Sequence, residues 1–372
     1  MLKIALIVGT RPEVIKMAPI AMAVKEEPGM RPVLILTAQH REMSDDVLKV
    51  FSLKPDYDLD IMKPNQSLFD VTGRLVRKLE TVLREERPDM VLVQGDTTST
   101  FVGSLCSYYL RIPVGHVEAG LRTYDKYSPF PEEVNRKLTT GLSDLHFAPT
   151  DVARDALLKE NVPRKAIFVV GNPVIDALLY VAGRDYSFKT RGLAGVDFTG
   201  KRLIAVTAHR RESWGKPYES MMRALRHIAR KHSDVLIVFP VHPNPNVREP
   251  VRKILGGKPR IVLVDPLDYQ EFVNLLKSCY FIITDSGGIQ EEAPSLGKPV
   301  LLMREVTERP EAVKAGAVRI VGTDTRRIVD AAAELLRSPK AYRRMVIDKN
   351  PYGDGTASRR IIRAAKRFLE GG

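Results

Sequence analysis

The chain has 372 residues, of which 44% are hydrophobic and 28% are charged; this excludes a disordered chain, because burial of that much apolar surface can offset the entropy cost of folding. Its 58 basic and 45 acidic side chains leave a net charge of +13, but aromatic residues do not interleave with the basic ones, so we expect no nucleic-acid partner. No run approaches the roughly 18 apolar residues that cross a bilayer, and two cysteines cannot form a disulfide framework or a zinc site. We therefore expect a cytoplasmic protein with no membrane partner and no bound metal.

Short apolar runs alternate with helix-length amphipathic stretches, a pattern typical of a parallel α/β sheet. The runs are continuous rather than alternating, as expected for strands that are buried on both faces. Within residues 68–87 the apolar side chains recur at helical spacing, which predicts an amphipathic helix with one buried face formed by Val71, Leu75, Leu79, Val82 and Leu83. In the first half of the chain the predicted strands are 3–8, 32–37, 90–94, 112–117, 145–148 and 167–170.

The pattern loosens near residues 171–176, and a second α/β series begins after the turn-rich stretch 183–200. We predict two Rossmann-type, doubly wound lobes, 1–175 and 176–352, followed by a C-terminal segment 353–372 that forms a helix at about 356–368. Two lobes of nearly equal size imply a cleft between them. The strands of the second series are 202–207, 235–240, 260–264, 280–284, 299–303 and 318–321.

Polar residues follow six of these strands, and ligands of such sheets bind beyond the carboxyl ends of the strands. Taken singly, Asp96 can be a helix cap and His209 can be structural, whereas Glu118 is a poor cap by residue type. Six polar strand ends that converge on one edge instead predict a single active cleft. The polar segments are 9–13, 95–98, 118–122, 208–212, 241–243 and 285–288.

The segment 285–292 is the sharpest local signal, because a strand enters a Gly-Gly turn before a helix. Gly287 and Gly288 let the backbone approach a phosphate, and the free N–H groups at the helix start bind its oxygens. Glu292 lies about one turn inside that helix, which suits it to ribose hydroxyls. No G-x-G-x-x-G follows the first strand and no P-loop is present, so we expect no nicotinamide or flavin cofactor.

Cationic side chains accompany these turns, and a diphosphate needs such groups. They are Arg11, Lys16, His209 and Arg309. The carboxylates Asp96 and Glu118 are joined by Glu132, although Glu132 or Glu133 can also be a solvated acid at a helix start. Three carboxylates opposite a cationic subsite indicate acid/base chemistry on a nucleotide-bound sugar.

The chain resembles the non-hydrolysing UDP-N-acetylglucosamine 2-epimerases along essentially its whole length. The resemblance rests on motifs that occur in the same order as in that family. They are GTRPE (9–13), TAQHR (37–41), GDT (95–97), HVEAGLRT (116–123), PEEVNR (131–136), HRRE (209–212), DSGGIQEEAP (285–294), TERPEA (307–312) and NPYGDG (350–355).

The resemblance implies a GT-B-like fold whose terminal helix crosses back to the first lobe, and a homodimer that interconverts UDP-GlcNAc and UDP-ManNAc without metal or nicotinamide. Glu42 and the loop 63–66 depart from the pattern of family members that carry a regulatory UDP-GlcNAc site. The implied residues are Asp96, Glu118, Glu132 and His209 for catalysis, Arg11, Lys16, Phe272, Ser286, Gly287, Gly288, Glu292 and Arg309 for UDP, and Gln39, His40, Arg210 and His242 for regulation.

This reaction suits the residues, because C2 of the sugar carries no conjugated carbonyl and its proton is not acidic. Departure of UDP from C1 develops positive charge there and makes the C2 proton removable, giving 2-acetamidoglucal. Reprotonation on the opposite face and return of UDP then invert C2. Which carboxylate is base and which is acid stays open. The alternative is a GT-B glycosyltransferase, which shares the fold and the donor site but needs an acceptor.

Overall fold

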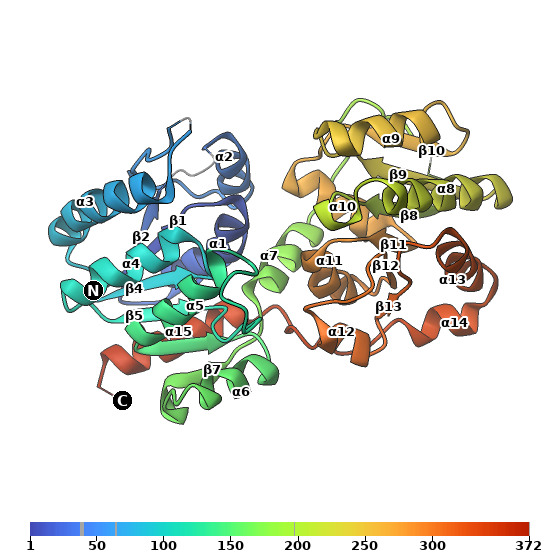
Figure 1. Cartoon of the computed structure of the whole chain (residues 1–372). Helices are drawn as coiled ribbons and strands as arrows, with labels where there is room; N and C mark the ends of the chain where they lie inside the picture. The colour runs from blue at the N-terminus through green and yellow to red at the C-terminus, as the bar shows by residue number, and fades with distance from the viewer. Residues whose placement is uncertain (38–40, 64, 197, 372) are drawn as a thin grey trace. The chain divides into compact units, whose positions relative to one another are not determined.

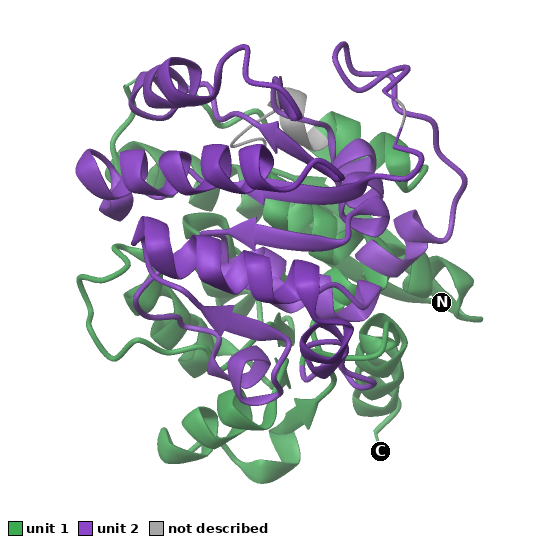
Figure 2. Cartoon of the chain, turned by 90° about the vertical axis from the view of Figure 1, so that its right-hand side faces the viewer, with its two compact units in different colours: residues 1–177, 352–372 green, residues 178–351 purple. Residues whose placement is uncertain are grey.

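The computed structural model describes residues 1–37, 41–63, 65–196 and 198–371. The chain divides into two compact units, which are coloured separately in Figure 2. Unit 1 comprises Met1–Ala177 and Tyr352–Gly372, and unit 2 comprises Leu178–Pro351. The C-terminal helix therefore belongs to the same unit as the N-terminal strand.

Unit 1 is built on a parallel sheet that has seven strands within the described residues, in the order β3-β2-β1-β4-β5-β6-β7 (Figure 1). Its strands are β1 (Leu2–Val8), β2 (Met30–Leu36), β3 (Tyr57–Asp58), β4 (Met90–Gln94), β5 (Val114–Val117), β6 (Leu145–Ala148) and β7 (Ile167–Val169). Its helices are α1 (Arg11–Glu26), α2 (Arg41–Val50), α3 (Leu68–Glu86), α4 (Thr98–Tyr109), α5 (Glu132–Leu142), α6 (Asp151–Lys159) and α15 (Ala357–Leu369); α7 (Pro173–Ala182) runs across the division between the units.

Helices cover both faces of this sheet. The predicted face of α3 is buried, and its five apolar residues join one core with α4 and strands β1, β2, β4 and β5. Each such side chain contributes about 1.5–3 kcal/mol through burial. Helix α15 packs against α1, and its residues Ala357 and Ser358 donate backbone N–H bonds to the carboxylate of Asp176.

Unit 2 repeats the plan with a parallel sheet that has six strands in the described part of the chain, in the order β10-β9-β8-β11-β12-β13. Its strands are β8 (Arg202–Thr207), β9 (Val235–Pro240), β10 (Ile261–Val264), β11 (Phe281–Thr284), β12 (Val300–Leu302) and β13 (Val318–Ile320). Its helices are α8 (Lys216–Lys231), α9 (Pro245–Leu255), α10 (Tyr269–Ser278), α11 (Gly287–Glu292), α12 (Pro310–Lys314), α13 (Thr325–Arg337) and α14 (Pro339–Arg344).

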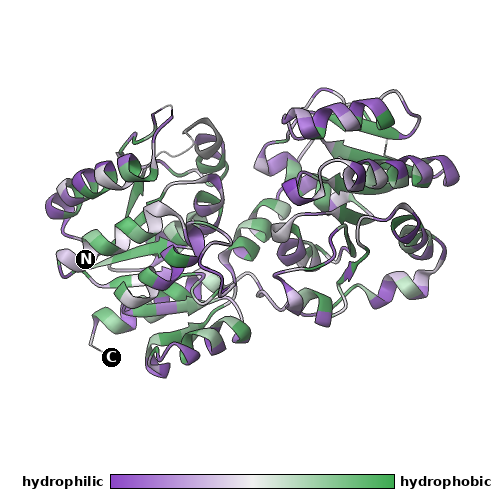
Figure 3. Cartoon of the chain, in the orientation of Figure 1, coloured by the Kyte–Doolittle hydropathy of each residue, from purple (hydrophilic) through white to green (hydrophobic). Residues whose placement is uncertain are grey.

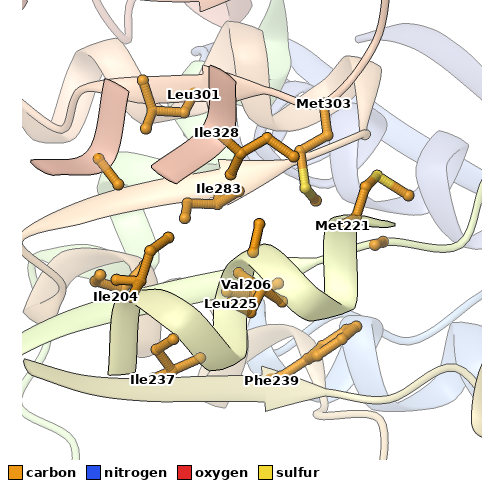
Figure 4. Close-up of a cluster of buried hydrophobic side chains, with 14 of the residues drawn as sticks. Ile204, Val206, Met221, Leu225, Ile237, Phe239, Ile283, Leu301, Met303 and Ile328 are labelled. Atoms are coloured by element: carbon orange, nitrogen blue, oxygen red, sulfur yellow. The ribbon is translucent and has the colours of Figure 1, made fainter. Parts of the chain in front are cut away.

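The strands of both units are apolar along their length, whereas the outer helices are polar on one side (Figure 3). In unit 2, Met221 and Leu225 of α8 and Ile328 of α13 belong to one buried core with strand residues such as Ile204 and Phe239 (Figure 4). Among the described residues, no helix combines the length and the apolar composition that crossing a membrane requires.

The predicted α/β fold is confirmed, and each of the twelve predicted strands overlaps an observed one. The sequence missed β3, a two-residue strand at the edge of the sheet. Its residues Tyr57 and Asp58 pair with β2 but form no apolar run that could indicate a strand.

Candidate active site

In both sheets the strand order reverses at a switch point, where ligands of doubly wound folds bind. In unit 1 this point lies between β1 and β4, which are followed by Gly9–Thr10 and Gly95–Asp96. In unit 2 it lies between β8 and β11, which are followed by His209 and by Asp285–Gly288. Four of the six polar strand ends found in the sequence therefore lie at the switch points of two separate sheets, and the other two follow the neighbouring strands β5 (Val114–Val117) and β9 (Val235–Pro240).

In unit 1 a buried carboxylate, Glu13, shapes the turn after β1. Its Oε2 accepts the backbone N–H groups of Gly9 at 3.1 Å and Thr10 at 2.7 Å, while its Oε1 accepts the hydroxyl groups of Thr97 at 2.8 Å and Thr100 at 3.2 Å. Burial raises the pKa of Glu13, although these hydrogen bonds oppose the rise. The turn that opens α1, and with it Arg11, is thereby joined to the turn that carries Asp96.

Glu118 lies directly after β5 in the left-handed region, with φ +62°, and its carboxylate is buried. Its Oε1 accepts bonds from Lys16 Nζ at 2.6 Å and Asn172 Nδ2 at 2.9 Å, and its Oε2 accepts a bond from Gln94 Nε2. Lys16, predicted as a UDP contact, therefore forms an ion pair with a predicted catalytic group. A carboxylate bound by this many donors is held in a single orientation.

Asp96 is the more exposed of the two carboxylates, with 27% of its side chain accessible. Both Nε and Nη2 of Arg136 donate to its Oδ2, at 2.8 and 2.7 Å. Its backbone carbonyl accepts a bond from Asn135 Nδ2 at 2.9 Å. Two residues of α5 thus hold this strand-end acid.

The two acids in the first turn of α5, Glu132 and Glu133, differ in burial. Glu132 is the first residue of α5 and is partly accessible. Glu133 is wholly buried, where it accepts the backbone N–H groups of Thr123 and Tyr124, each at 3.0 Å. Of the two acids that the sequence left open, Glu133 stabilises the preceding loop, whereas Glu132 is partly accessible.

In unit 2, Asp285 orders the turn after β8. It is completely buried, and its Oδ2 accepts the backbone N–H groups of His209 at 2.7 Å and Arg210 at 2.8 Å. Its Oδ1 lies 3.7 Å from His209 Nδ1 and has no hydrogen-bond partner among the described residues. The carboxylate therefore fixes the His209 backbone and faces its imidazole.

A pocket of about 410 Å³ opens beside His209. The His209 ring stacks on that of His242, which follows β9, with centroids 5.7 Å apart. Burial and the neighbouring His209 lower the pKa of His242. The lining residues are His209, Arg210, Arg211, Glu212, Trp214, His242 and Asn244.

The Gly-Gly turn after β11 is flanked by guanidinium groups. A Cβ on Gly287 would lie 3.5 Å from Arg210 Nη2 and 4.0 Å from Arg309 Cζ, whereas a Cβ on Gly288 would meet no atom within 4 Å. Arg309 Nε also donates to Glu291 at 2.5 Å. The space beside this turn is positively charged and open, as a phosphate requires.

Helix α11 spans Gly287–Glu292, so Glu292 is its last residue and lies just over one turn from its start. Ser286 is its N-cap residue, and Phe272 lies partly buried on α10. The predicted regulatory residues Gln39 and His40 lie outside the described residues, whereas Arg210 and His242 both line the pocket of unit 2.

The sequence-based site prediction did not name the residues that hold these groups in place, namely Glu13, His116, Asn135, Arg136 and Asp285; the ring of His116 lies 2.8 Å from the Gly95 carbonyl. All five stand inside the quoted motifs, and a capping pattern, Thr10 followed three residues later by Glu13, was available as a signal. Their contacts with Asp96, His209 and the turns required the fold.

Two doubly wound units, each with charged side chains at its switch point, define a two-unit Rossmann-type α/β protein of the GT-B-like class.

The family model described as UDP-N-acetylglucosamine 2-epimerase matches residues 22–366. The chain is 54% identical to UDP-N-acetylglucosamine 2-epimerase from Yersinia pestis, covering 98% of both chains, and 50% identical to the one from Bacillus subtilis, covering 97% of this chain and 94% of that protein. The structure of UDP-GlcNAc 2-epimerase from Neisseria meningitidis bound to UDP-GlcNAc matches with a TM-score of 0.87 at 44% identity, covering 98% of this chain and all of that one. The chain belongs to the UDP-N-acetylglucosamine 2-epimerase family.

Proposed function

We propose that the chain catalyses the reversible C2 epimerisation of UDP-GlcNAc and UDP-ManNAc, by elimination of UDP to 2-acetamidoglucal and its re-addition. The observation that carries the proposal is the set of carboxylates around the β1/β4 switch point of unit 1. Asp96 follows β4, Glu118 Oε2 lies 3.6 Å from where a Cβ on Gly95 would be, and Glu132 opens the helix whose next turn holds Asp96. Membership of the family supports this activity over glycosyl transfer.

The elimination breaks the C1–O and C2–H bonds and makes the C1=C2 π bond and an O–H bond on the carboxylate. The C1–O electron pair leaves with UDP, the C2 proton passes to a carboxylate, and the C2–H electron pair becomes the C1=C2 double bond. Protonation at C2 on the other face and return of UDP to C1 reverse these changes. Positioned acid and base groups contribute about 10²–10⁴-fold each.

Hydrogen bonding separates the three carboxylates by role. Both oxygens of Glu118 are engaged by Lys16, Asn172 and Gln94, so we assign Glu118 to binding and electrostatic stabilisation at the sugar. Asp96 and Glu132 are the more accessible acids, and we assign the two proton transfers to them. This division leaves one carboxylate for each face of C2.

We propose that unit 2 binds the nucleotide. Arg210, Arg309 and the open turn Gly287–Gly288 offer a cationic phosphate site, and His209 adds an imidazole beside it. As electrostatic groups, they stabilise the charge of departing UDP. Phe272, Ser286 and Glu292 complete the proposed UDP contacts of unit 2. Arg11 and Lys16, which the resemblance also implies for UDP, belong to unit 1, where Lys16 pairs with Glu118.

Two further expectations accompany the proposal. We expect a homodimer, as the resemblance implied. We place the protein in the cytoplasm, in keeping with two buried free thiols, Cys106 and Cys279. Regulation by UDP-GlcNAc stays open, because Glu42 and the loop 63–66 depart from the regulated pattern; the residues that the resemblance implies for it are Arg210, His242, Gln39 and His40.

Solvent exchange tests the reaction. The enzyme is incubated with UDP-GlcNAc in deuterated water, and the recovered UDP-sugars are weighed by mass spectrometry. Epimerisation predicts deuterium at C2 of both epimers, whereas a glycosyltransferase leaves the recovered donor unlabelled. An absence of label in the sugar refutes the proposal.

The site assignment is tested by Asp96→Asn and Glu132→Gln, which should abolish turnover and leave UDP affinity, measured by calorimetry, nearly unchanged. Asp155→Asn, an exposed acid on α6, is the matched control and should keep wild-type rates. A wild-type rate in either site variant removes that residue from the mechanism.

A further inference from the structure

The motif 131–136 contributes more to the site than Glu132. Arg136, one turn further along α5, directs two of its nitrogens at one oxygen of Asp96: Nε and Nη2 donate to Oδ2 at 2.8 and 2.7 Å. None of the described residues donates a hydrogen bond to the other oxygen, Oδ1. The arginine fork therefore engages one side of the carboxylate and leaves the opposite side available.

The guanidinium of Arg136 is itself held by a second carboxylate, Glu133. Its Nη1 donates to Glu133 Oε2 at 2.9 Å, and only 13% of the arginine side chain is accessible. Burial alone would raise the pKa of Glu133, but the N–H groups of Thr123 and Tyr124 and the Arg136 guanidinium together lower it. Glu133 is thus a buried carboxylate that orients the guanidinium and fixes the loop before α5.

The backbone that carries Asp96 is fixed independently of this ion pair. Asn135 Nδ2 donates to the Asp96 carbonyl at 2.9 Å, and His116 Nε2 lies 2.8 Å from the Gly95 carbonyl. Burial lowers the pKa of His116 to about 3, so its ring is neutral at physiological pH and Nε2–H is the donor. With the main chain held in this way, Arg136 sets only the direction and the charge of the side chain.

We infer that Arg136 is a positioning residue, which holds the Asp96 carboxylate through Oδ2 so that Oδ1 is the atom that exchanges a proton with C2 of the sugar. The inference rests on the proposed function and deepens it. In the direction in which Asp96 is the base, the C2–H bond breaks and its proton joins Oδ1. The electron pair forms the C1=C2 bond as the C1–O pair leaves with UDP. In the other direction Oδ1 returns the proton.

A positioning role differs from a stabilising ion pair in what it changes. Misplacement of a reacting group by about 1 Å can slow a reaction about 10²-fold without weakening substrate binding. If the ion pair were merely structural, its removal would instead lower the midpoint of thermal unfolding and reduce the fraction of active protein. A split between kcat and KM therefore separates the two.

The test compares Arg136→Gln and Arg136→Lys with a matched control, Arg154→Gln, whose arginine pairs with the exposed acids Asp151 and Asp155 on α6. We expect Arg136→Gln to lower kcat and C2 deuterium incorporation about 10²-fold, with KM and UDP affinity within about threefold of wild type. Lysine restores the charge but not the two-pronged geometry, so Arg136→Lys should recover about tenfold. Arg154→Gln should match wild type.

A second variant tests the inference in case Arg136→Gln does not fold. Arg136→Ala opens space for a free guanidinium ion, and guanidinium at a concentration below the denaturing range should raise its kcat while leaving Asp96→Asn unchanged. Wild-type kcat in Arg136→Gln, or no rescue of folded Arg136→Ala, overturns the inference. If wild-type enzyme incorporates no deuterium, the proposed function fails instead, so the two failures are distinguishable.

Discussion

The buried carboxylate of Glu13 allows a prediction in which two substitutions at one position should differ widely. In Glu13→Ala, the N–H groups of Gly9 and Thr10 lose their acceptor, and each buried unsatisfied donor costs about 1–3 kcal/mol. The cavity left by the side chain adds to that, so we expect the free energy of unfolding of unit 1 to fall by about 3–5 kcal/mol.

Glu13→Gln should be far milder. Glutamine keeps one oxygen for the two backbone N–H groups and can turn its NH₂ group toward the hydroxyl oxygens of Thr97 and Thr100, which can accept as well as donate. We expect a loss of about 1 kcal/mol, the net value of an ordinary hydrogen bond.

The stabilities of wild type and of Glu13→Gln should also depend differently on pH. Because the pKa of Glu13 is raised in the folded state, the folded protein holds that proton more tightly than the unfolded chain does. Its stabilising contribution is fully present below the unfolded pKa, near 4.5, and is lost as the pH rises through the folded pKa. Wild type should therefore exceed Glu13→Gln in stability most at low pH, and the difference should shrink as the pH rises above about 4.5.

Urea unfolding at several pH values measures this difference. Far-ultraviolet circular dichroism follows both units, whereas the fluorescence of Trp214, the single tryptophan of the sequence, reports unit 2. The Glu13 variants should shift the circular dichroism transition. A difference between wild type and Glu13→Gln that grows with pH, or an alanine variant as stable as the glutamine variant, would refute the reasoning.

Two glycines and one acid give the remaining predictions. Gly120→Ala places a Cβ 2.2 Å from the Ala153 carbonyl oxygen at φ +91°, so thermal unfolding should show a loss of about 3 kcal/mol or more; Gly73→Ala, in open space on α3, should instead gain about 0.5–1 kcal/mol. Asp285→Asn keeps an oxygen for two backbone N–H groups but removes the charge that faces His209, so calorimetry should show UDP binding about tenfold weaker with little change in the unfolding midpoint. Unchanged UDP affinity in that variant would count against a role for this pair in nucleotide binding.

The fold was predictable because the sheets are parallel. Strands buried on both faces must be apolar at every position, so β1 and β4 stand out as continuous runs in the sequence. The buried face of α3 was predictable for a similar reason, since all five expected residues are buried. The two-residue strand β3 lies at an edge, where burial imposes no such pattern.

The partners of the candidate site residues were not predictable to the same degree. The strand-end rule pointed to Asp96 and Glu118, because the chain direction alone places them at one edge of the sheet. It could not pair Lys16 with Glu118 across 102 residues, or Arg136 with Asp96 across 40. Those pairs depend on the rotation of α1 and α5 about their axes, which short-range sequence patterns do not determine.

The acids of the site can be ranked by how much of their hydrogen-bonding capacity the fold consumes. Glu13 uses both oxygens on turns and neighbouring hydroxyls, and Glu118 uses both on Lys16, Asn172 and Gln94. An oxygen that already accepts such bonds must break one to take a proton from a substrate, at a cost of about 1.5–3 kcal/mol when the acceptor is charged. Among the described residues, Asp96 takes both of its side-chain hydrogen bonds on Oδ2, so Oδ1 can accept a proton without that cost. The same comparison supports the role proposed for Glu118 in electrostatic stabilisation, because its orientation is fixed and its oxygens are occupied.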